Sequence, residues 1–89
     1  MALPIAFQIT ATGSAQQLPS HPIITGPITL TAKSGNTAAI AIGTTSAVTG
    51  STGYLLPAGQ SVTLNLQSGN TNQLWINGTA NDVLSVIGV

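Results

Sequence analysis

The chain has 89 residues and only two fully charged side chains, Lys33 and Asp82, whereas about 25% of residues are charged in an ordinary soluble domain. One lysine cannot neutralise several phosphates, which excludes a basic nucleic-acid-binding surface, and the absence of cysteine excludes disulfides and thiolate metal sites. No run approaches the roughly 20 apolar residues of a membrane-spanning helix, so no membrane partner is expected.

The first predicted element is a strand near the N-terminus. Apolar residues alternate from Ile5 to Ala11, which is typical of a half-buried strand. Residues 12–27 differ, because they contain three prolines and little alternation. We interpret residues 1–27 as an N-terminal strand followed by an extended segment. Two roles stay open for that segment: a plain connector, or an arm that reaches a neighbouring subunit.

Residues 28–89 are predicted to form the body of a single domain. Alternation at 28–32 and 40–42 predicts two strands. A turn at 50–53 precedes a short strand at 54–56, and Pro57 indicates that this strand is short or lies at a sheet edge. Alternation at 62–66 and 74–76 predicts two more strands. The closing run 83–87 is nearly continuous in apolar residues, which indicates a more central strand.

The body contains an internal repeat. Residues 28–37 (ITLTAKSGNT) match residues 62–71 (VTLNLQSGNT) at an offset of 34, and Ile42 then aligns with Ile76. We interpret each repeat as a β-hairpin whose Ser-Gly-Asn-Thr turn supplies positive φ angles. The two related hairpins would face each other, one in each sheet. Chance similarity in a Thr- and Gly-rich chain is the alternative.

Together these elements predict an all-β fold: a small antiparallel β-sandwich, jelly-roll-like or Greek key, with two related hairpins and an extended N-terminal segment. Disorder is the competing interpretation, but it goes with low hydrophobicity and high net charge. Here 43% of the residues are hydrophobic and the net charge is zero. A domain this small buries a modest core, so we expect it to gain stability by assembling with copies of itself.

The few titratable residues argue against catalysis and metal binding. A triad of serine, His21 and Asp82 is formally available, but no Gly-x-Ser-x-Gly motif is present. We therefore expect no enzyme activity, no cofactor and no metal site. His21 could join a metal site about an oligomer axis, although a solvated or packed loop histidine is favoured. Asp82 could bind calcium with Asn81, although a local turn-capping role is favoured.

Four residues are candidates for contact with a subunit or partner: Trp75, Tyr54, Phe7 and His21. Trp75 lies between Leu74 and Ile76, so it points outward if those two point inward. Three roles stay open for Trp75: a subunit or partner contact, packing beneath residues 12–27, or a ligand platform. Aromatic residues on a surface poor in charge are favoured interface anchors.

Three stretches carry a resemblance to a known group of proteins: residues 39–43 (AIAIG), 53–64 (GYLLPAGQSVTL) and 74–84 (LWINGTANDVL). They resemble small β-sandwich proteins of tailed bacteriophage particles, of the capsid decoration (cement) or head- or tail-fibre type. The resemblance covers residues 28–89. It implies a homotrimer that binds the major capsid protein on the capsid surface, with no catalytic residues to carry over.

The leading functional hypothesis is therefore a non-enzymatic capsid decoration protein that stabilises the phage head. The N-terminus lacks a basic region and a long apolar stretch, so we expect no signal peptide and synthesis in the host cytoplasm. One alternative is a tail, collar or fibre component. Another is a carbohydrate-binding β-module that uses Trp75 and Tyr54.

Overall fold

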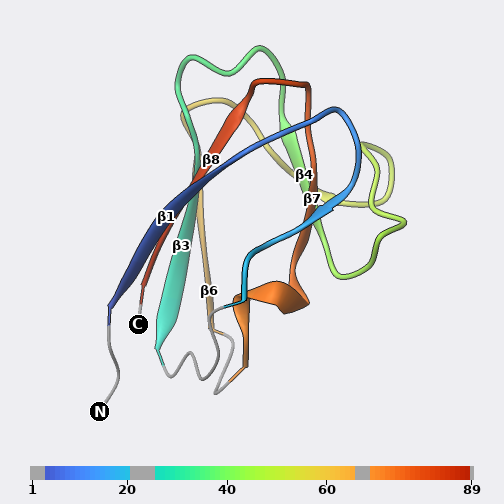
Figure 1. Cartoon of the computed structure of the whole chain (residues 1–89). Helices are drawn as coiled ribbons and strands as arrows, with labels where there is room; N and C mark the ends of the chain where they lie inside the picture. The colour runs from blue at the N-terminus through green and yellow to red at the C-terminus, as the bar shows by residue number, and fades with distance from the viewer. Residues whose placement is uncertain (1–3, 21–25, 66–68, 89) are drawn as a thin grey trace.

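The structure is a computed structural model that describes residues 4–20, 26–65 and 69–88. Within these residues, eight strands form two antiparallel four-stranded sheets, which face each other in Figure 1. The sheets enclose one hydrophobic core. The elements in chain order are β1 (Ile5–Thr10), β2 (Gln16–Gln17), β3 (Pro27–Ala32), β4 (Ile40–Gly43), β5 (Tyr54–Leu56), β6 (Ser61–Asn65), the 3-10 helix η1 (Thr71–Gln73), β7 (Trp75–Asn77) and β8 (Val83–Gly88). The predicted all-β sandwich is confirmed.

The order of the strands is that of a jelly roll. Sheet A has the order β1-β8-β3-β6, and sheet B has the order β2-β7-β4-β5. In the described part of the chain, β4 and β5 are the only consecutive strands that pair with each other. Every other connection crosses from one sheet to the other, which is how two Greek keys build a jelly roll.

The core follows from the alternation along each strand. The central strands β3 and β8 place a fully buried apolar side chain at every second position, and β7 does the same with Ile76. The edge strands β1 and β6 alternate in the same way, but their inward side chains are only partly buried. As predicted from its apolar run, β8 lies inside its sheet, between β1 and β3.

The internal repeat is real, but its units are not hairpins. Each repeat contributes one strand to each sheet, so β3 pairs with β6 in sheet A and β4 pairs with β7 in sheet B. Thr29 faces its equivalent Thr63, and Ile42 faces its equivalent Ile76. An antiparallel pairing centred on equivalent residues in both sheets is the signature of a pseudo-twofold axis. The prediction of one hairpin per sheet is therefore wrong, because the turn in each unit joins the two sheets.

The Ser-Gly-Asn-Thr turns also work differently from the prediction. Among the described residues, positive φ occurs at Gly13, Gly59 and Asn81 and at no residue of these turns. The turns are held by side chains instead. Asn36 donates to the Val83 carbonyl at 2.9 Å and accepts from the Val83 amide at 2.8 Å, as a neighbouring strand would. At the position equivalent to Thr37, the buried Thr71 hydroxyl donates to the Pro19 carbonyl at 2.6 Å.

The predicted extended segment lies on the body over its described part. Gln16 and Gln17 form β2, which pairs with β7, and Leu18 is 2% exposed inside the core. The Gln17 side chain donates to the Asn72 carbonyl at 2.7 Å. Up to residue 20 the segment is therefore a packed connector, and the interpretation of an outstretched arm is wrong there. Residues 21–25 lie outside the described residues.

Candidate assembly surfaces

The outer face of sheet A is neutral and rich in hydroxyl groups. Its side chains form two rows across the four strands, as the strand register shows. The rows are Ala6, Ile87, Thr29 and Thr63, followed by Gln8, Ser85, Thr31 and Ser61. Hydroxyl groups of neighbouring strands form hydrogen bonds within each row. The hydroxyl oxygens of Thr29 and Thr63 are 3.1 Å apart, and those of Thr31 and Ser61 are 2.8 Å apart. This ladder holds short polar side chains in one layer.

Ile87 is the apolar feature of this face. Its side chain is 60% exposed, although it lies on a central strand between Ala6 and Thr29. A hollow of about 420 Å³ lies beside it, bordered by β1, β3 and β8. A large exposed aliphatic residue at the centre of a neutral face is a candidate contact residue. Side-chain direction alternates along a strand, so if Leu84 and Val86 point inward, Ser85 and Ile87 point outward. This count could have identified Ile87 from the sequence.

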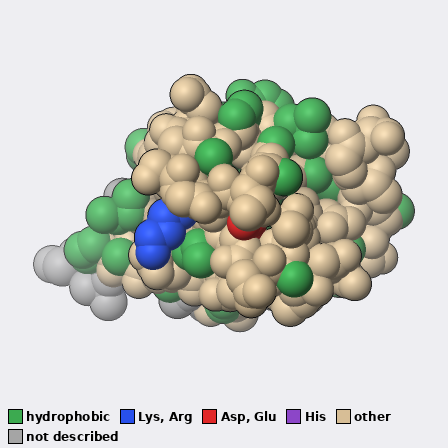
Figure 2. Space-filling model, turned by 90° about the horizontal axis from the view of Figure 1, so that it is seen from above, with side chains coloured by type: hydrophobic (Ala, Val, Ile, Leu, Met, Phe, Trp, Pro, Cys, Tyr) green, Lys and Arg blue, Asp and Glu red, His purple; other side chains and the backbone are tan. Residues whose placement is uncertain are grey.

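Charge is nearly absent from the described surface. Figure 2 shows one face of the molecule on which green and tan side chains dominate, with a single blue group and a small red one. The blue group is Lys33, which is exposed, and the red one is Asp82, which is only 4% exposed. Among the described residues, Lys33 is thus the only exposed side chain with a full charge.

Asp82 anchors the turn between β3 and β4. Its carboxylate accepts from the Thr37 amide at 2.9 Å, from the Ala38 amide at 3.2 Å and from the Thr37 hydroxyl at 3.1 Å. The hydrogen bond from the Thr37 amide is the main reason why the pKa of Asp82 is lowered. Together with the bonds from Ala38 and the Thr37 hydroxyl, it outweighs the burial that raises this pKa. Asp82 does cap a turn, but the turn is 45 residues away, so the prediction of a local cap is corrected.

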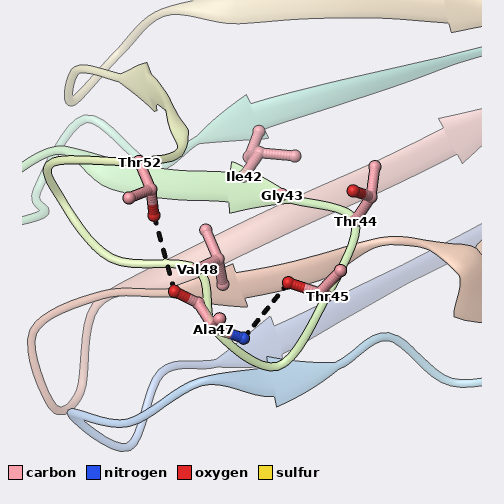
Figure 3. A pocket seen from close by; sticks show the side chains of 7 residues that line it. All are labelled: Ile42, Gly43, Thr44, Thr45, Ala47, Val48 and Thr52. Atoms are coloured by element: carbon pink, nitrogen blue, oxygen red, sulfur yellow. Dashed lines mark hydrogen bonds between the residues drawn. The ribbon is translucent and has the colours of Figure 1, made fainter.

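The outer face of sheet B is covered around β4 by the long β4–β5 connection, residues 44–53. Val48 is 4% exposed and lies over Gly43 and Gly53, as Figure 3 shows for Gly43. Asn77 of β7 donates to the Val48 carbonyl at 3.0 Å and so ties the connection to the sheet. Internal hydrogen bonds shape it further, because the Thr45 hydroxyl accepts from the Ala47 amide and the Thr52 hydroxyl donates to the Ala47 carbonyl (Figure 3).

A hollow of about 370 Å³ remains between this connection and β4, lined by Gly43, Val48 and three threonines. It contains no titratable side chain, so it offers hydroxyl and backbone groups and no acid–base chemistry. The connection was missed as a cover for the sheet, since it has no alternating pattern. Gly43 and Gly53 mark it in the sequence only in retrospect, because a Cβ at either position would meet Val48.

We expect Gly43→Ala to lower the free energy of unfolding by about 1–3 kcal/mol, the usual cost of overpacking. An added Cβ would lie 2.6 Å from Val48 Cγ2 and 2.7 Å from Val48 Cβ, so Val48 would have to move. Gly50→Ala is the matched control, because nothing lies within 4 Å of a Cβ there. Urea unfolding of both variants checks this. Equal stabilities would show that the connection does not press on the sheet.

The predicted aromatic contacts are separated by the sheet. Trp75 pairs with Gly43, and Tyr54 pairs with Ile42. Gly43 and Ile42 are consecutive residues of β4 and point to opposite faces, so Trp75 and Tyr54 do too. Trp75 is half-buried on the outer face, beside Gln17, whereas Tyr54 is 59% exposed on the edge strand β5. The two rings cannot form one platform.

The other two predicted contact residues have different outcomes. Phe7 is half-buried and packs against the core from the edge strand β1, and its contact with a partner stays a prediction. His21 lies outside the described residues. Among the residues that the structure describes, no three His, Cys, Asp or Glu side chains gather as metal ligands. No helix in that part of the chain is long and apolar enough to span a membrane.

Comparison with known proteins identifies the fold and no family. No family model matches the chain, and no curated protein matches it. A structure from Bacillus endospore appendages, described as a family of disulfide-linked pili, is similar with 17% identity, a TM-score of 0.54, and coverage of 97% of this chain and 84% of that one. Hydroxypropylphosphonic acid epoxidase from S. wedmorenis is similar with 14% identity, a TM-score of 0.54, and coverage of 97% and 42%. At these identities the likeness shows a shared jelly-roll fold alone.

Proposed function

We propose that this chain is a non-enzymatic structural subunit that assembles with copies of itself and with a larger protein surface, as a capsid decoration protein does on a phage head. One observation carries the proposal: a folded domain whose described surface has a single exposed charge, Lys33. Free monomers normally stay soluble through mixed surface charges and a net charge away from zero. A neutral surface is suited to being covered.

The place of assembly rests on the sequence resemblance of residues 28–89 to phage particle proteins. The structural neighbours do not bear on it, because neither is a component of a virus particle. The jelly roll agrees with the resemblance, since capsid proteins use this fold, but so do lectins and cupins. The major capsid protein is therefore the partner proposed here, with a homotrimer as the proposed form.

A filament subunit is the second candidate. It is favoured by the similarity to a subunit of endospore appendages, which spans nearly the whole of this chain. The disulfide linkage of those pili has no counterpart here, because this chain has no cysteine. A glycan-binding module is not proposed, since Trp75 and Tyr54 point to opposite faces of sheet B.

We expect attachment to the particle to be nearly independent of salt from about 0.05 to 1 M, because screening acts on charge pairs and these surfaces have almost none. Sedimentation of particles followed by quantification of the bound chain checks this. Release at high salt would contradict the proposal. Cryo-EM of the particle separates the possible positions on a phage: density on the head lattice supports decoration, and density only at the tail supports a tail or fibre role. Electron microscopy of the purified chain tests the filament candidate, which predicts filaments without any particle.

A further inference from the structure

The two edge strands of sheet A have unpaired outer sides and inward side chains that are only partly buried. Strand β1 forms one edge and β6 the other, and no described strand pairs with their free sides. Their inward residues are the partly buried members of the core, namely Ile5, Phe7, Ile9, Val62 and Leu64. The edge strands of sheet B, β2 and β5, contain only two and three residues. Sheet B therefore leaves the longer edges of sheet A incompletely covered.

The backbone hydrogen bonds of sheet A determine which backbone groups of the two edge strands face outward. The Ala11 amide donates to Asp82 beside β1, and the Ala32 amide donates to Gln60 beside β6. Hydrogen-bonding direction alternates along an antiparallel strand. The amide and carbonyl groups of Ala6 and Gln8 therefore point away from β8. By the same count, those of Ser61 and Thr63 point away from β3.

Neither edge carries the usual protection against pairing. Natural proteins guard exposed edges with lysines, prolines, bulges or inward-pointing charges. The strands β1 (IAFQIT) and β6 (SVTLN) contain no charged residue and no proline, and their registers with β8 and β3 run without interruption. Edges of five and six residues without these devices are sites for the addition of another strand.

The two edges are complementary to each other. Sheet A has four strands in a continuous antiparallel order, so β6 runs opposite to β1. A second copy placed beside β6 would continue the sheet with the same alternation of direction. One register that keeps every side chain on its own face pairs Thr63 with Ala6 of the next copy and Val62 with Phe7 of the next copy. The two side-chain rows of the outer face then continue into the next copy, and the inward apolar residues continue the core.

We propose that β6 of one copy adds to β1 of the next copy, so that sheet A runs on across the subunit boundary. This inference deepens the proposed function, on which it rests, by naming the contact through which copies meet. The contact is heterologous, because it joins two different edges. Such contacts close into a ring when the rotation between neighbours permits it and otherwise grow into a filament. A ring of three copies would be the trimer.

The test uses one blocked edge at a time. Gln8→Pro removes an outward amide from β1, and Thr63→Pro removes one from β6, while each leaves its internal ladder intact. Gln8→Ala and Thr63→Ala are the matched controls, because they lose the same side-chain hydrogen bonds and keep the amides. Circular dichroism establishes that each variant is folded. Ala6→Pro and Ser61→Pro block the same edges if a first variant does not fold.

We expect sedimentation of the full chain to show assembly for the wild type and both alanine controls. Each proline variant alone should be monomeric. A 1:1 mixture of the two proline variants should form a dimer of twice the monomer mass and nothing larger, because only one edge contact can be made. A contact between two different edges predicts this combination: each proline variant is monomeric when measured separately, and the two variants form a dimer when mixed.

Several outcomes overturn the inference. Assembly of either proline variant alone excludes the head-to-tail contact, and a dimer of Thr63→Pro alone indicates β1 pairing with β1. A monomeric mixture, with assembly instead abolished by Ile87→Lys, indicates contact through the outer face of sheet A. In these cases the proposed function stands and the edge contact fails. A wild type that is monomeric at every concentration overturns the edge contact together with the self-assembly in the proposed function.

Discussion

Replacing Ile76 with alanine is expected to lower the free energy of unfolding by about 3–4 kcal/mol, within the range for buried Ile→Ala changes. Ile76 is fully buried and faces Ile42, its equivalent in the first repeat, where the pseudo-twofold axis crosses sheet B. A small domain has a total stability of about 5–15 kcal/mol. The substitution should therefore remove a large share of it and lower the melting temperature by roughly 10 °C or more.

The matched control is Ile87→Ala, the same chemical change at a side chain that is 60% exposed. It should change the stability by less than about 0.5 kcal/mol. Urea unfolding followed by tryptophan fluorescence suits both variants, since Trp75 is the only tryptophan in the chain. If the two variants lose equal stability, the assignment of Ile76 to the inside and Ile87 to the outside is wrong.

The strands and most of the core were predictable from local pattern. Alternation identified β1, β3 and β6 with their inward faces, because a strand that is buried on one side repeats every two residues. The apolar run identified β8 as a central strand but did not distinguish its two faces. Strand β2 was missed because two residues are too short to show alternation. Pro57 was informative for a physical reason: β5 ends at Leu56 and pairs only with β4, as expected of a strand at an edge.

The pairing of the strands was not predictable in the same way. A strand, a turn and a strand describe a hairpin and a crossing between sheets equally well, and the partner is chosen by contacts far away in the chain. Asn36 bonding Val83 and Asp82 bonding Thr37 are such contacts. The repeat offset contained the missing information, since equivalent strands of a pseudo-twofold pair can face each other across its axis.

The candidate surfaces show the same division. The scarcity of charge was visible in the composition, and Trp75 was correctly placed on the outer face of its strand. The opposite orientation of Tyr54 was hidden, because it depends on the register between β4 and β5. Ile87 was overlooked for a related reason: an apolar run reads as buried on both sides, although the outer face of sheet A is open.

Removal of the Asp82 carboxylate is the second large effect that we expect. Asp82→Ala leaves the amides of Thr37 and Ala38 without their acceptor, in a turn that joins the two sheets. The melting temperature should fall by roughly 10 °C. Lys33→Ala is the control, since it also removes a full charge, but from an exposed position, and should change the melting temperature by only about 1–2 °C. Similar losses in both variants would contradict the anchoring role.

The same carboxylate should make stability depend on pH in one direction. The pKa of Asp82 is lowered in the folded chain, chiefly by the Thr37 amide, whereas an unfolded aspartate has a pKa of about 3.9. The stabilisation is therefore fully present above pH 3.9 and is lost as the pH falls through the folded pKa.

Asp82→Asn removes this titration. The difference in melting temperature between wild type and Asp82→Asn should be constant above about pH 5 and shrink in acid. A difference that persists unchanged to pH 2 would mean that the carboxylate does not carry its charge in the fold.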